Sequence, residues 1–347
     1  MTSLPRELGY RMPAEWEPHE ATWLSWPKDP VTWPDRVPQA QEAFAQMIEA
    51  LTPNEKVHLL VDDEAMEEAA RRKLSSKKVN EGNLLIHPIK TVDSWIRDYG
   101  PNFIKRESEI AYNCWIFNAW GGKYETLMED NGLPKRISHL LDLPFFEPGI
   151  VMEGGSIEVN GQGTVLTTEQ CLLNANRNPK LFKNEIEKYL KDYLGAKQVL
   201  WLGEGVAGDD TDGHVDDITR FVAADTIVTV VEEDPEDENY APLQENLKRL
   251  RSMKNLDGKP FKLLTLPMPG RVEDDEGERL PASYANFYIA NGVVLVPLYR
   301  HANDAKALGI LKGCFPDRKI VGIECNDLIW GMGAIHCVTQ QQPASSL

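Results

Sequence analysis

The sequence has no segment that would place the protein in a membrane. No apolar run in its 347 residues approaches the roughly 20 residues that a membrane helix needs. The segment from Met1 to Met12 also has no apolar core of the kind found in signal peptides. We therefore expect a cytoplasmic protein that does not associate with membranes.

Cysteine patterns and metal-binding patterns are equally sparse. The five cysteines are odd in number and include no C-x-x-C pair, which argues against a disulfide framework or a zinc ribbon. The seven histidines include no H-E-x-x-H or H-x-H pair, so we expect neither a metal nor another cofactor. Four cysteines are expected to be buried structural residues: Cys114, Cys171, Cys314 and Cys325.

Basic side chains are outnumbered by acidic ones. There are 37 Lys and Arg against 54 Asp and Glu, which gives a formal net charge of −17. A field of this sign repels nucleic acid and attracts small cations, so nucleic-acid binding is not expected. Acidity is common in soluble proteins, however, and does not by itself identify a cationic ligand.

Helical and strand-like periodicities alternate along the chain. Apolar residues at helical spacing predict helices over 38–51, 179–194, 241–253 and 303–313. Gly195 would end the second helix before a strand over 198–201. Four strand pairs are predicted as hairpins: 102–105 with 110–117, 156–159 with 164–167, 218–222 with 226–231, and 286–290 with 293–298.

A polar residue stands at or just before the start of each hairpin. These residues are Asp98, Glu153, His214 with Asp216, and Asn286, and Cys337 continues the series at intervals of 51 to 72 residues. Such a period is typical of strand-helix units stacked around an axis, and a ring brings equivalent positions to one end of a central channel. We therefore predict a single α/β domain over residues 1–347, although hairpin spacing alone could produce the same intervals by coincidence.

Cys337 is the candidate nucleophile. Glycines precede it in the segment Gly331-Met332-Gly333, and they would leave the sulfur accessible. A thiolate is a strong nucleophile when a neighbouring cation stabilises its charge. A buried structural cysteine is the equally plain alternative.

His214 and Asp216 form a candidate acid-base pair. If His214 begins a strand, both side chains point to the same face, because side chains alternate along a strand. His336 adjoins Cys337 directly and would point away from it, which makes it the poorer base. An isolated His-x-Asp also occurs in solvated loops.

Asp98 and Glu153 complete a set suited to one kind of substrate. Each alone reads as a cap or turn residue. Together with the cysteine and the histidine, however, the carboxylates would suit a planar, permanently charged guanidinium, whose fixed fork of N–H donors pairs with carboxylates.

Several of these residues lie in motifs that recur in one known family. The motifs are MPAEWEPH at 12–19, TWLSWP at 22–27, RDYGP at 97–101, EGG at 153–155, HVD at 214–216 and IHCVTQQ at 335–341. In this order the chain resembles, from Met12 to Pro343, the agmatine deiminase and bacterial peptidyl-arginine deiminase family of the guanidine-modifying superfamily. The resemblance implies a five-bladed α/β propeller, or pentein, and a hydrolase that acts on C–N bonds of linear amidines.

The resemblance also implies roles for the anchor residues. Cys337 would attack the guanidinium carbon while Asp98 and Asp216 hold the guanidinium nitrogens. His214 would protonate the departing ammonia and then activate water against the amidino-cysteine intermediate. Glu153 would hydrogen-bond to His214 and raise its basicity.

Three further residues are predicted to bind substrate, and one loop departs from the family pattern. The additional substrate-binding residues are Trp95, Asp212 and Asn286. Agmatine deiminases tend to read Gly-Gly-Gly-Asn where this chain has Gly331-Met332-Gly333-Ala334, so the wall around the nucleophile is expected to differ.

The substrate expected from this family is agmatine, converted to N-carbamoylputrescine and ammonia in putrescine biosynthesis. Agmatine is a dication, and Asp209, Asp210 and Asp212 could supply negative charge for its ammonium end. Free arginine would require basic residues, and the motifs contain only Arg97 and Arg220. Arginine and peptidyl-arginine remain alternative substrates.

Two other classes of protein remain open. A Cys-His-Asp amide hydrolase would use the same nucleophile without needing two carboxylate clamps. A non-enzymatic binding protein could use the same propeller scaffold. The sequence is also compatible with a homo-oligomer.

Overall fold

The chain folds into a mixed α/β structure, which the computed structural model describes for residues 3–345. The longer helices are α1 (Val37–Leu51), α2 (Glu64–Leu74), α8 (Lys183–Leu194), α9 (Tyr240–Ser252) and α10 (Asp304–Cys314). The short helices are α3 (Ile96–Tyr99), α4 (Ala119–Gly122), α5 (Leu133–Arg136), α6 (Ser138–Leu141) and α7 (Glu169–Leu172). The 3-10 turns are η1 (Glu81–Asn83), η2 (Glu125–Gly132), η3 (Gly154–Ser156), η4 (Val215–Asp217) and η5 (Leu328–Gly331).

Sixteen strands are found within the described residues. They are β1 (His19–Ser25), β2 (Lys56–Val61), β3 (Leu84–Pro88), β4 (Asn102–Arg106), β5 (Glu109–Asn113), β6 (Phe145–Phe146), β7 (Glu158–Val159), β8 (Thr164–Thr168), β9 (Gln198–Leu202), β10 (Thr219–Ala223), β11 (Thr226–Val231), β12 (Lys262–Pro267), β13 (Tyr288–Ala290), β14 (Val293–Leu298), β15 (Lys319–Glu324) and β16 (Gln340–Pro343).

These strands form five small sheets among residues 3–345. Four sheets share one design, in which an antiparallel pair is followed by a third strand parallel to the second. Helices α5 and α6, α8, α9 and α10 connect the second and third strands, because parallel neighbours cannot be joined by a tight turn. In the fifth sheet, β16 pairs antiparallel with β1, so strands from near both ends of the chain lie side by side.

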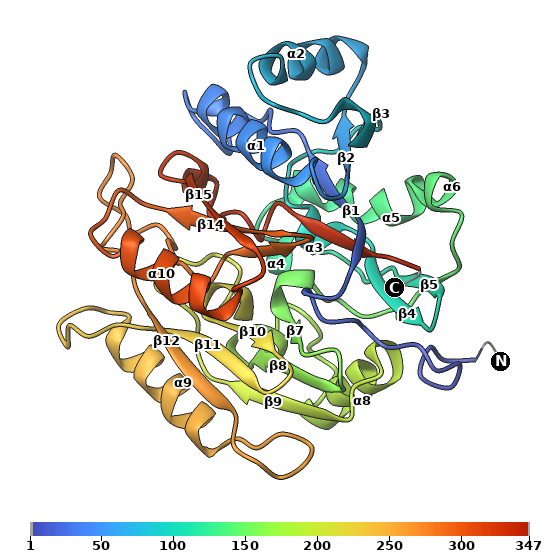
Figure 1. The fold of residues 1–347 in the computed structure, drawn as a ribbon. Coiled ribbons are helices and arrows are strands. Elements are labelled where there is room, and N and C mark those ends of the chain that lie inside the picture. Colours follow the sequence, from blue (N-terminus) through green and yellow to red (C-terminus); the bar gives the residue numbers. More distant parts are fainter. Residues whose placement is uncertain (1–2, 346–347) are drawn as a thin grey trace.

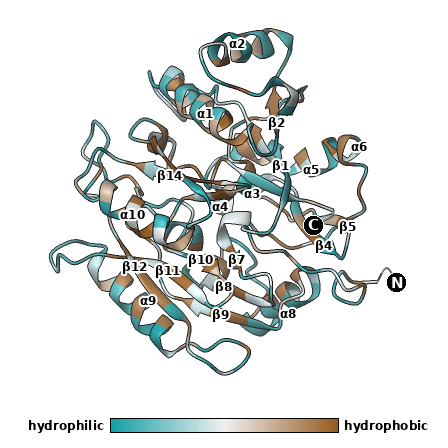
Figure 2. Cartoon of the chain, viewed as in Figure 1, coloured by the Kyte–Doolittle hydropathy of each residue, from teal (hydrophilic) through white to brown (hydrophobic). Residues whose placement is uncertain are grey.

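The strands lie toward the middle of the molecule, and α1, α8, α9 and α10 lie on the outside (Figure 1). The strands are largely hydrophobic, whereas the outer helices mix hydrophilic and hydrophobic residues (Figure 2). In α1, for example, Phe44, Ile48 and Leu51 are buried in the main hydrophobic core. This pattern is that of amphipathic helices that cover the sheets. Within residues 3–345 no helix is both long and apolar enough to span a bilayer.

Most of the predicted elements are confirmed. The turns in two hairpins contain Gly161 and Gly292, whose φ angles of 69° and 68° only glycine adopts without strain. The strand predicted over 110–117 ends earlier, at Asn113, because the chain then leaves its partner and bridges Ile116 to Val151.

The helix predicted over 179–194 begins only at Lys183. Residues before it form turns in which the Asn178 side chain bonds both the N–H and the C=O of Val151. These contacts hold the segment against a neighbouring strand segment and compete with helix formation. As a result Phe182, expected on the buried face, is 76% exposed.

Candidate active site

The polar anchors from separate hairpins meet around the imidazole of His214. Its Nδ1 lies 3.8 Å from Asp98 Oδ1 and 4.0 Å from Asp216 Oδ1. Its Nε2 lies 4.0 Å from Glu153 Oε2. All four side chains are buried. Segments from α3, η3 and η4 are brought together here although they lie far apart in the sequence.

The carboxylate of Asp98 is held by two donors. The N–H of Gly155 donates to its Oδ1 over 2.9 Å, and the indole of Trp120 donates to its Oδ2 over 2.9 Å. Burial raises the pKa of Asp98, although the charge of His214 opposes the shift. A Cβ on Gly155 would lie 2.5 Å from His214 Nδ1, so only glycine fits between the two residues.

The carboxylate of Asp216 has one occupied oxygen and one free oxygen. His336 Nδ1 lies 2.6 Å from Oδ2, and His336 Nε2 lies 2.7 Å from Glu15. Oδ1 has no hydrogen-bond partner within residues 3–345. His336 therefore orients Asp216 rather than acting as a free base.

His214 does not begin a strand, so the alternation of side chains along a strand does not apply to His214 and Asp216. It is the cap residue of η4, with φ −55° and ψ 139°. In a 3-10 turn successive side chains are rotated by about 120° instead of alternating. Asp217 consequently also faces the site: its carboxylate accepts a hydrogen bond from Asn286 Nδ2 over 2.8 Å, and it lies within 4.8 Å of the Cys337 sulfur.

Cys337 lies in the turn before β16, close to three carboxylates. Asn286 Nδ2 donates toward its sulfur over 3.1 Å, so the residue predicted near substrate lies beside the nucleophile. Burial raises the pKa of the Cys337 thiol well above its ordinary value, and the charges of Asp216, Asp217 and Asp98 raise it further. The thiol will ionise readily only when a cation enters beside it.

The carboxylates of Asp98 and Asp216 disfavour the thiolate of Cys337 but favour the charged form of the His214 imidazole. Burial lowers its pKa, but the Asp98 carboxylate, the Cys171 sulfur and the Asp216 carboxylate raise it well above its ordinary value. These charges favour the imidazolium form of His214, which can donate a proton.

A cavity of about 200 Å³ leads to Cys337. Trp95 and Trp120 line it and meet edge to face, with ring centroids 6.5 Å apart. The glycine loop forms another wall: a Cβ on Gly333 would lie 2.6 Å from the Trp95 ring and 3.2 Å from the Cys337 sulfur. Met332 also lines the cavity, in a left-handed conformation with φ 72°.

Acidic residues also line the cavity. Asp210 accepts a hydrogen bond from the Tyr124 hydroxyl over 2.6 Å, and burial raises the pKa of Asp210 to about 6. Asp29 and Asp93 are also in the lining, whereas no Lys or Arg of residues 3–345 is.

Asp212, predicted to bind substrate, does not line the cavity. Its φ of 65° turns the residue back toward a neighbouring loop, where it accepts hydrogen bonds from Arg177 (2.6 Å), Lys123 (2.8 Å) and Asn176 (2.9 Å). These donors lower its pKa against the effect of burial. Asp210, rather than Asp212, lines the cavity.

Arg177 is a site residue that the sequence did not reveal. Its Nε donates to Glu153 Oε1 over 2.6 Å, and its Nη2 donates to the Thr211 carbonyl over 2.7 Å. The hydrogen bond expected between Glu153 and His214 is not formed, because their closest polar atoms are 4.0 Å apart. Arg177 lies in a loop between two asparagines, and no motif marks it.

Two groups of side chains have donor atoms close enough to hold a metal, among the residues described. Glu153, Cys171 and His214 form one, and Asp216, Asp217 and Cys337 form the other. The residues of each group come from at least two segments far apart in the sequence, so no spacing motif could have predicted either group.

Comparison with known proteins identifies close relatives. Residues 11–343 match the family model described as Porphyromonas-type peptidyl-arginine deiminase. An agmatine deiminase from Pseudomonas aeruginosa is 37% identical over 366 residues, which cover 99% of this chain and 98% of that protein. The structure of an agmatine deiminase from Enterococcus faecalis superposes with a TM-score of 0.93 at 35% identity, over 99% of both chains. An amidinotransferase from Microseira wollei shares the fold alone, with a TM-score of 0.51 at 11% identity over 96% of this chain and 97% of its own.

Proposed function

This chain belongs to the Porphyromonas-type peptidyl-arginine deiminase family, and on that premise we propose that it hydrolyses agmatine to N-carbamoylputrescine and ammonia. It is a hydrolase of C–N bonds in linear amidines. The observation that carries the choice of agmatine is the lining of the cavity, which includes three aspartates and, among residues 3–345, no basic residue.

The guanidinium of the substrate sits between Asp98 and Asp216. The free oxygen of Asp216 and the carboxylate of Asp98 lie on the Nδ1 side of His214. Two buried carboxylates match a guanidinium because its N–H donors point outward in one plane. Binding in this way fixes the guanidinium carbon in front of the Cys337 sulfur.

The positive charge of the substrate activates the nucleophile. Burial and three carboxylates raise the pKa of the Cys337 thiol well above its ordinary value. A guanidinium neutralises those carboxylates, so the thiol proton leaves to solvent as the substrate binds. Asn286 Nδ2, 3.1 Å from the sulfur, stabilises the resulting thiolate.

The reaction then proceeds in two stages. The Cys337 sulfur bonds to the guanidinium carbon, the bond to one terminal nitrogen breaks, and the imidazolium of His214 gives that nitrogen the proton with which it leaves as ammonia. Water next attacks the same carbon and gives a proton to the now neutral His214. The carbon–sulfur bond breaks, and the sulfur takes the remaining proton, which yields N-carbamoylputrescine and restores the thiol.

The rest of the cavity holds the aminobutyl tail. Trp95 and Trp120 flank its methylene groups, and Asp210 pairs with its ammonium. Free arginine carries a carboxylate at this end, which Asp29, Asp93 and Asp210 repel. Peptidyl-arginine carries no charge there and leaves the Asp210 carboxylate without a cation to pair with.

We further propose that the five sheets are the blades of one α/β propeller, with residues 1–347 as a single catalytic domain. The common order of strands in four sheets supports this arrangement. The anchors then occupy equivalent positions at one end of the shared axis. The small charged substrate favours a cytoplasmic enzyme.

The test is ammonia release from agmatine, free arginine and a peptidyl-arginine ester, with mass spectrometry of each product. We expect kcat/KM for agmatine to exceed the other values by at least about a hundredfold, because each alternative leaves the aspartates of the cavity without a matching cation. Equal or greater activity on arginine or the ester would refute agmatine as the substrate. Cys337→Ala protein supplies the background rate.

A further inference from the structure

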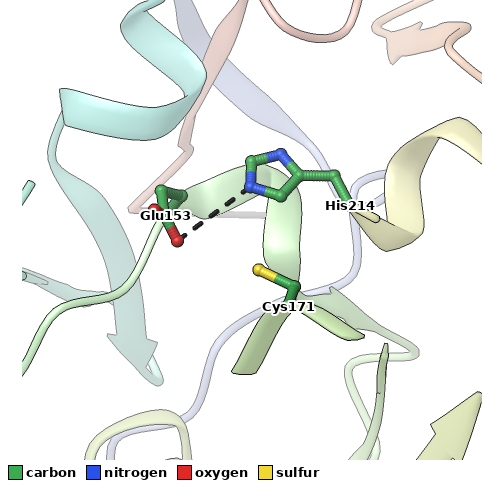
Figure 3. A group of neighbouring side chains, drawn as sticks. All are labelled: Glu153, Cys171 and His214. Atoms are coloured by element: carbon green, nitrogen blue, oxygen red, sulfur yellow. Dashed lines mark ion pairs between the residues drawn. The ribbon is translucent and has the colours of Figure 1, made fainter. Parts of the chain in front are cut away.

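Behind the imidazole of His214, on the side away from Asp98 and Asp216, lies a second cluster of polar side chains. Glu153, Cys171 and His214 each direct one donor atom toward a common point, and these atoms lie within 4.8 Å of one another (Figure 3). Cys171 comes from α7, and the other two precede η3 and η4. All three residues are buried.

Two atoms of this cluster have no hydrogen-bond partner among residues 3–345: Glu153 Oε2 and His214 Nε2. Their side chains are 0% and 1% exposed, and the two atoms are 4.0 Å apart. A buried polar atom without a partner typically costs about 1–3 kcal/mol, so two facing the same point indicate that a further group fits between them.

We propose that Glu153, Cys171 and His214 form a Zn²⁺ site through which the metal reversibly inhibits the enzyme. A thiolate, an imidazole and a carboxylate are the three ligand types that zinc takes in proteins. Zinc–ligand bonds of about 2.0–2.3 Å place neighbouring ligand atoms roughly 3.3–3.8 Å apart in a tetrahedron. The observed 4.0 Å between Glu153 and His214 needs only a small contraction. Water completes the coordination.

The orientation of His214 also suits metal binding. Its other ring nitrogen faces Asp98 and Asp216, at 3.8 Å and 4.0 Å. A histidine that binds a metal usually directs its second nitrogen toward a carboxylate in this way.

The charges in the cluster balance those of the metal. On binding, the Cys171 thiol and His214 Nε2 would each release a proton to solvent, so the thiolate and Glu153 together neutralise Zn²⁺. Arg177 lies beside Glu153, but its charge is matched by Asp212, 2.6 Å away.

Inhibition follows from the nitrogen that the metal occupies. A zinc ion on Nε2 prevents His214 from moving between imidazolium and imidazole, which the two stages of the reaction require. The inhibitory consequence therefore rests on the proposed function, whereas the metal site itself does not.

The first experiment measures binding in a protein that cannot turn over. Cys337→Ser removes the only other thiol that lies in a metal-binding group among the described residues. Titration of this variant with Co²⁺, a spectroscopic probe for zinc sites, should give a thiolate-to-cobalt absorption band in the near ultraviolet. Adding Cys171→Ala to the same protein should abolish the band.

The outcomes separate the two possible sulfur ligands. A band seen in the wild type but absent from Cys337→Ser assigns the metal to Cys337, Asp216 and Asp217 and overturns the proposal. No band in any protein overturns it as well. Should the Cys171→Ala chain fail to fold, Cys171→Ser in the same background gives the same test, because a hydroxyl does not ionise to bind zinc.

The second experiment measures inhibition of agmatine turnover by Zn²⁺. Replacing Cys171 by Ala should raise the half-inhibitory concentration by at least about tenfold, because even outer partners of a metal contribute that much to its affinity. Cys314→Ser, at a half-buried cysteine outside the cluster, should keep the wild-type value. An unchanged value for Cys171→Ala would refute the inhibitory role. If agmatine is not a substrate, the cobalt band still reports on the site.

Discussion

The side-chain amide of Asn286 lies 3.1 Å from the sulfur of Cys337, although 51 residues separate them. The same amide nitrogen donates to Asp217 over 2.8 Å, and its oxygen accepts the N–H of His336 over 2.9 Å. With every polar atom engaged, the amide cannot rotate away from the sulfur. It is therefore a fixed donor, in place before the thiolate forms.

We expect Cys337→Ala and Cys337→Ser to abolish turnover without preventing substrate binding, because a hydroxyl ionises far less readily than a thiol. Acid-quenched wild-type enzyme should show an added amidino group on the peptide that contains Cys337. An adduct on another cysteine would contradict the assignment.

Asn286→Ala should lower kcat by about 10- to 100-fold, as expected for the loss of a hydrogen bond to a charged group.

Asp98→Asn and Asp216→Asn should each lower kcat/KM by well over about a hundredfold, a barrier increase of roughly 2.7 kcal/mol or more. Each change keeps the shape of the side chain but replaces a charged acceptor with a donor beside a cationic substrate. Steady-state kinetics with agmatine would measure the effect.

Exposed Asp257 is the matched control for these variants. Asp257→Asn should be silent, since a charge in a distant loop is screened by solvent. Asp217→Asn should also impair turnover, because Asp217 holds Asn286 against Cys337. Equal losses in Asp98→Asn and Asp257→Asn would mean that a general acidic field, not a clamp, binds the substrate.

Gly155→Ala should lower kcat by at least about a hundredfold. The added methyl would lie 2.5 Å from His214 Nδ1 and 3.0 Å from Asp98 Oδ1, so the imidazole and the clamp must move apart. A misplacement on the order of 1 Å can cost about a hundredfold in rate.

Gly309, in α10, provides the control for this substitution. Nothing lies within 4 Å of a Cβ built on it. Gly309→Ala should keep full activity and raise the free energy of unfolding by about 0.5–1 kcal/mol, since alanine favours helices. Full activity in Gly155→Ala would show that His214 tolerates displacement.

The KM for agmatine should rise as the pH falls through about 6. Burial raises the pKa of Asp210 to about 6, so its carboxylate is charged above that pH and neutral below it, whereas both ends of agmatine stay protonated. Asp93 has its pKa raised by burial to about 6 as well, but hydrogen bonds from Thr32 and Trp95 engage its carboxylate.

The variant Asp210→Asn tests whether Asp210 or Asp93 causes the change of KM with pH. It should raise KM by about tenfold at pH 8, with the loss of one charge-assisted contact, and should flatten the rise of KM at low pH. If the KM of Asp210→Asn changed with pH as it does in the wild type, a residue other than Asp210 would bind the ammonium group.

Much of the site could be predicted because strands place their neighbours in a regular way. The hairpins at Asn160-Gly161 and Asn291-Gly292 follow from local turn chemistry, and Glu153 and Asn286 stand just before them in the sequence. The motifs then suggested which side chains should meet there.

The remainder depends on contacts that no local pattern encodes. The 3-10 geometry of η4 turns Asp217 toward Cys337, and a left-handed residue turns Asp212 away from the cavity. Arg177 reaches Glu153 from a loop whose path is set by tertiary hydrogen bonds. Loops of this kind adopt the conformation that their partners impose, and a single sequence does not contain those partners' positions.

The pairing of β16 with β1 also bears on how the protein is made. Translation delivers β1 early and β16 late, and Cys337 lies in the turn just before β16. A nascent chain can thus gather Asp98, Glu153, His214 and Asp216 while its first sheet still has an open edge. The nucleophile is fixed only after the residues through Pro343 have left the ribosome and closed that edge. Catalytic competence is then acquired in one late step, because a chain that ends before His336 and Cys337 lacks both the imidazole that orients Asp216 and the nucleophile.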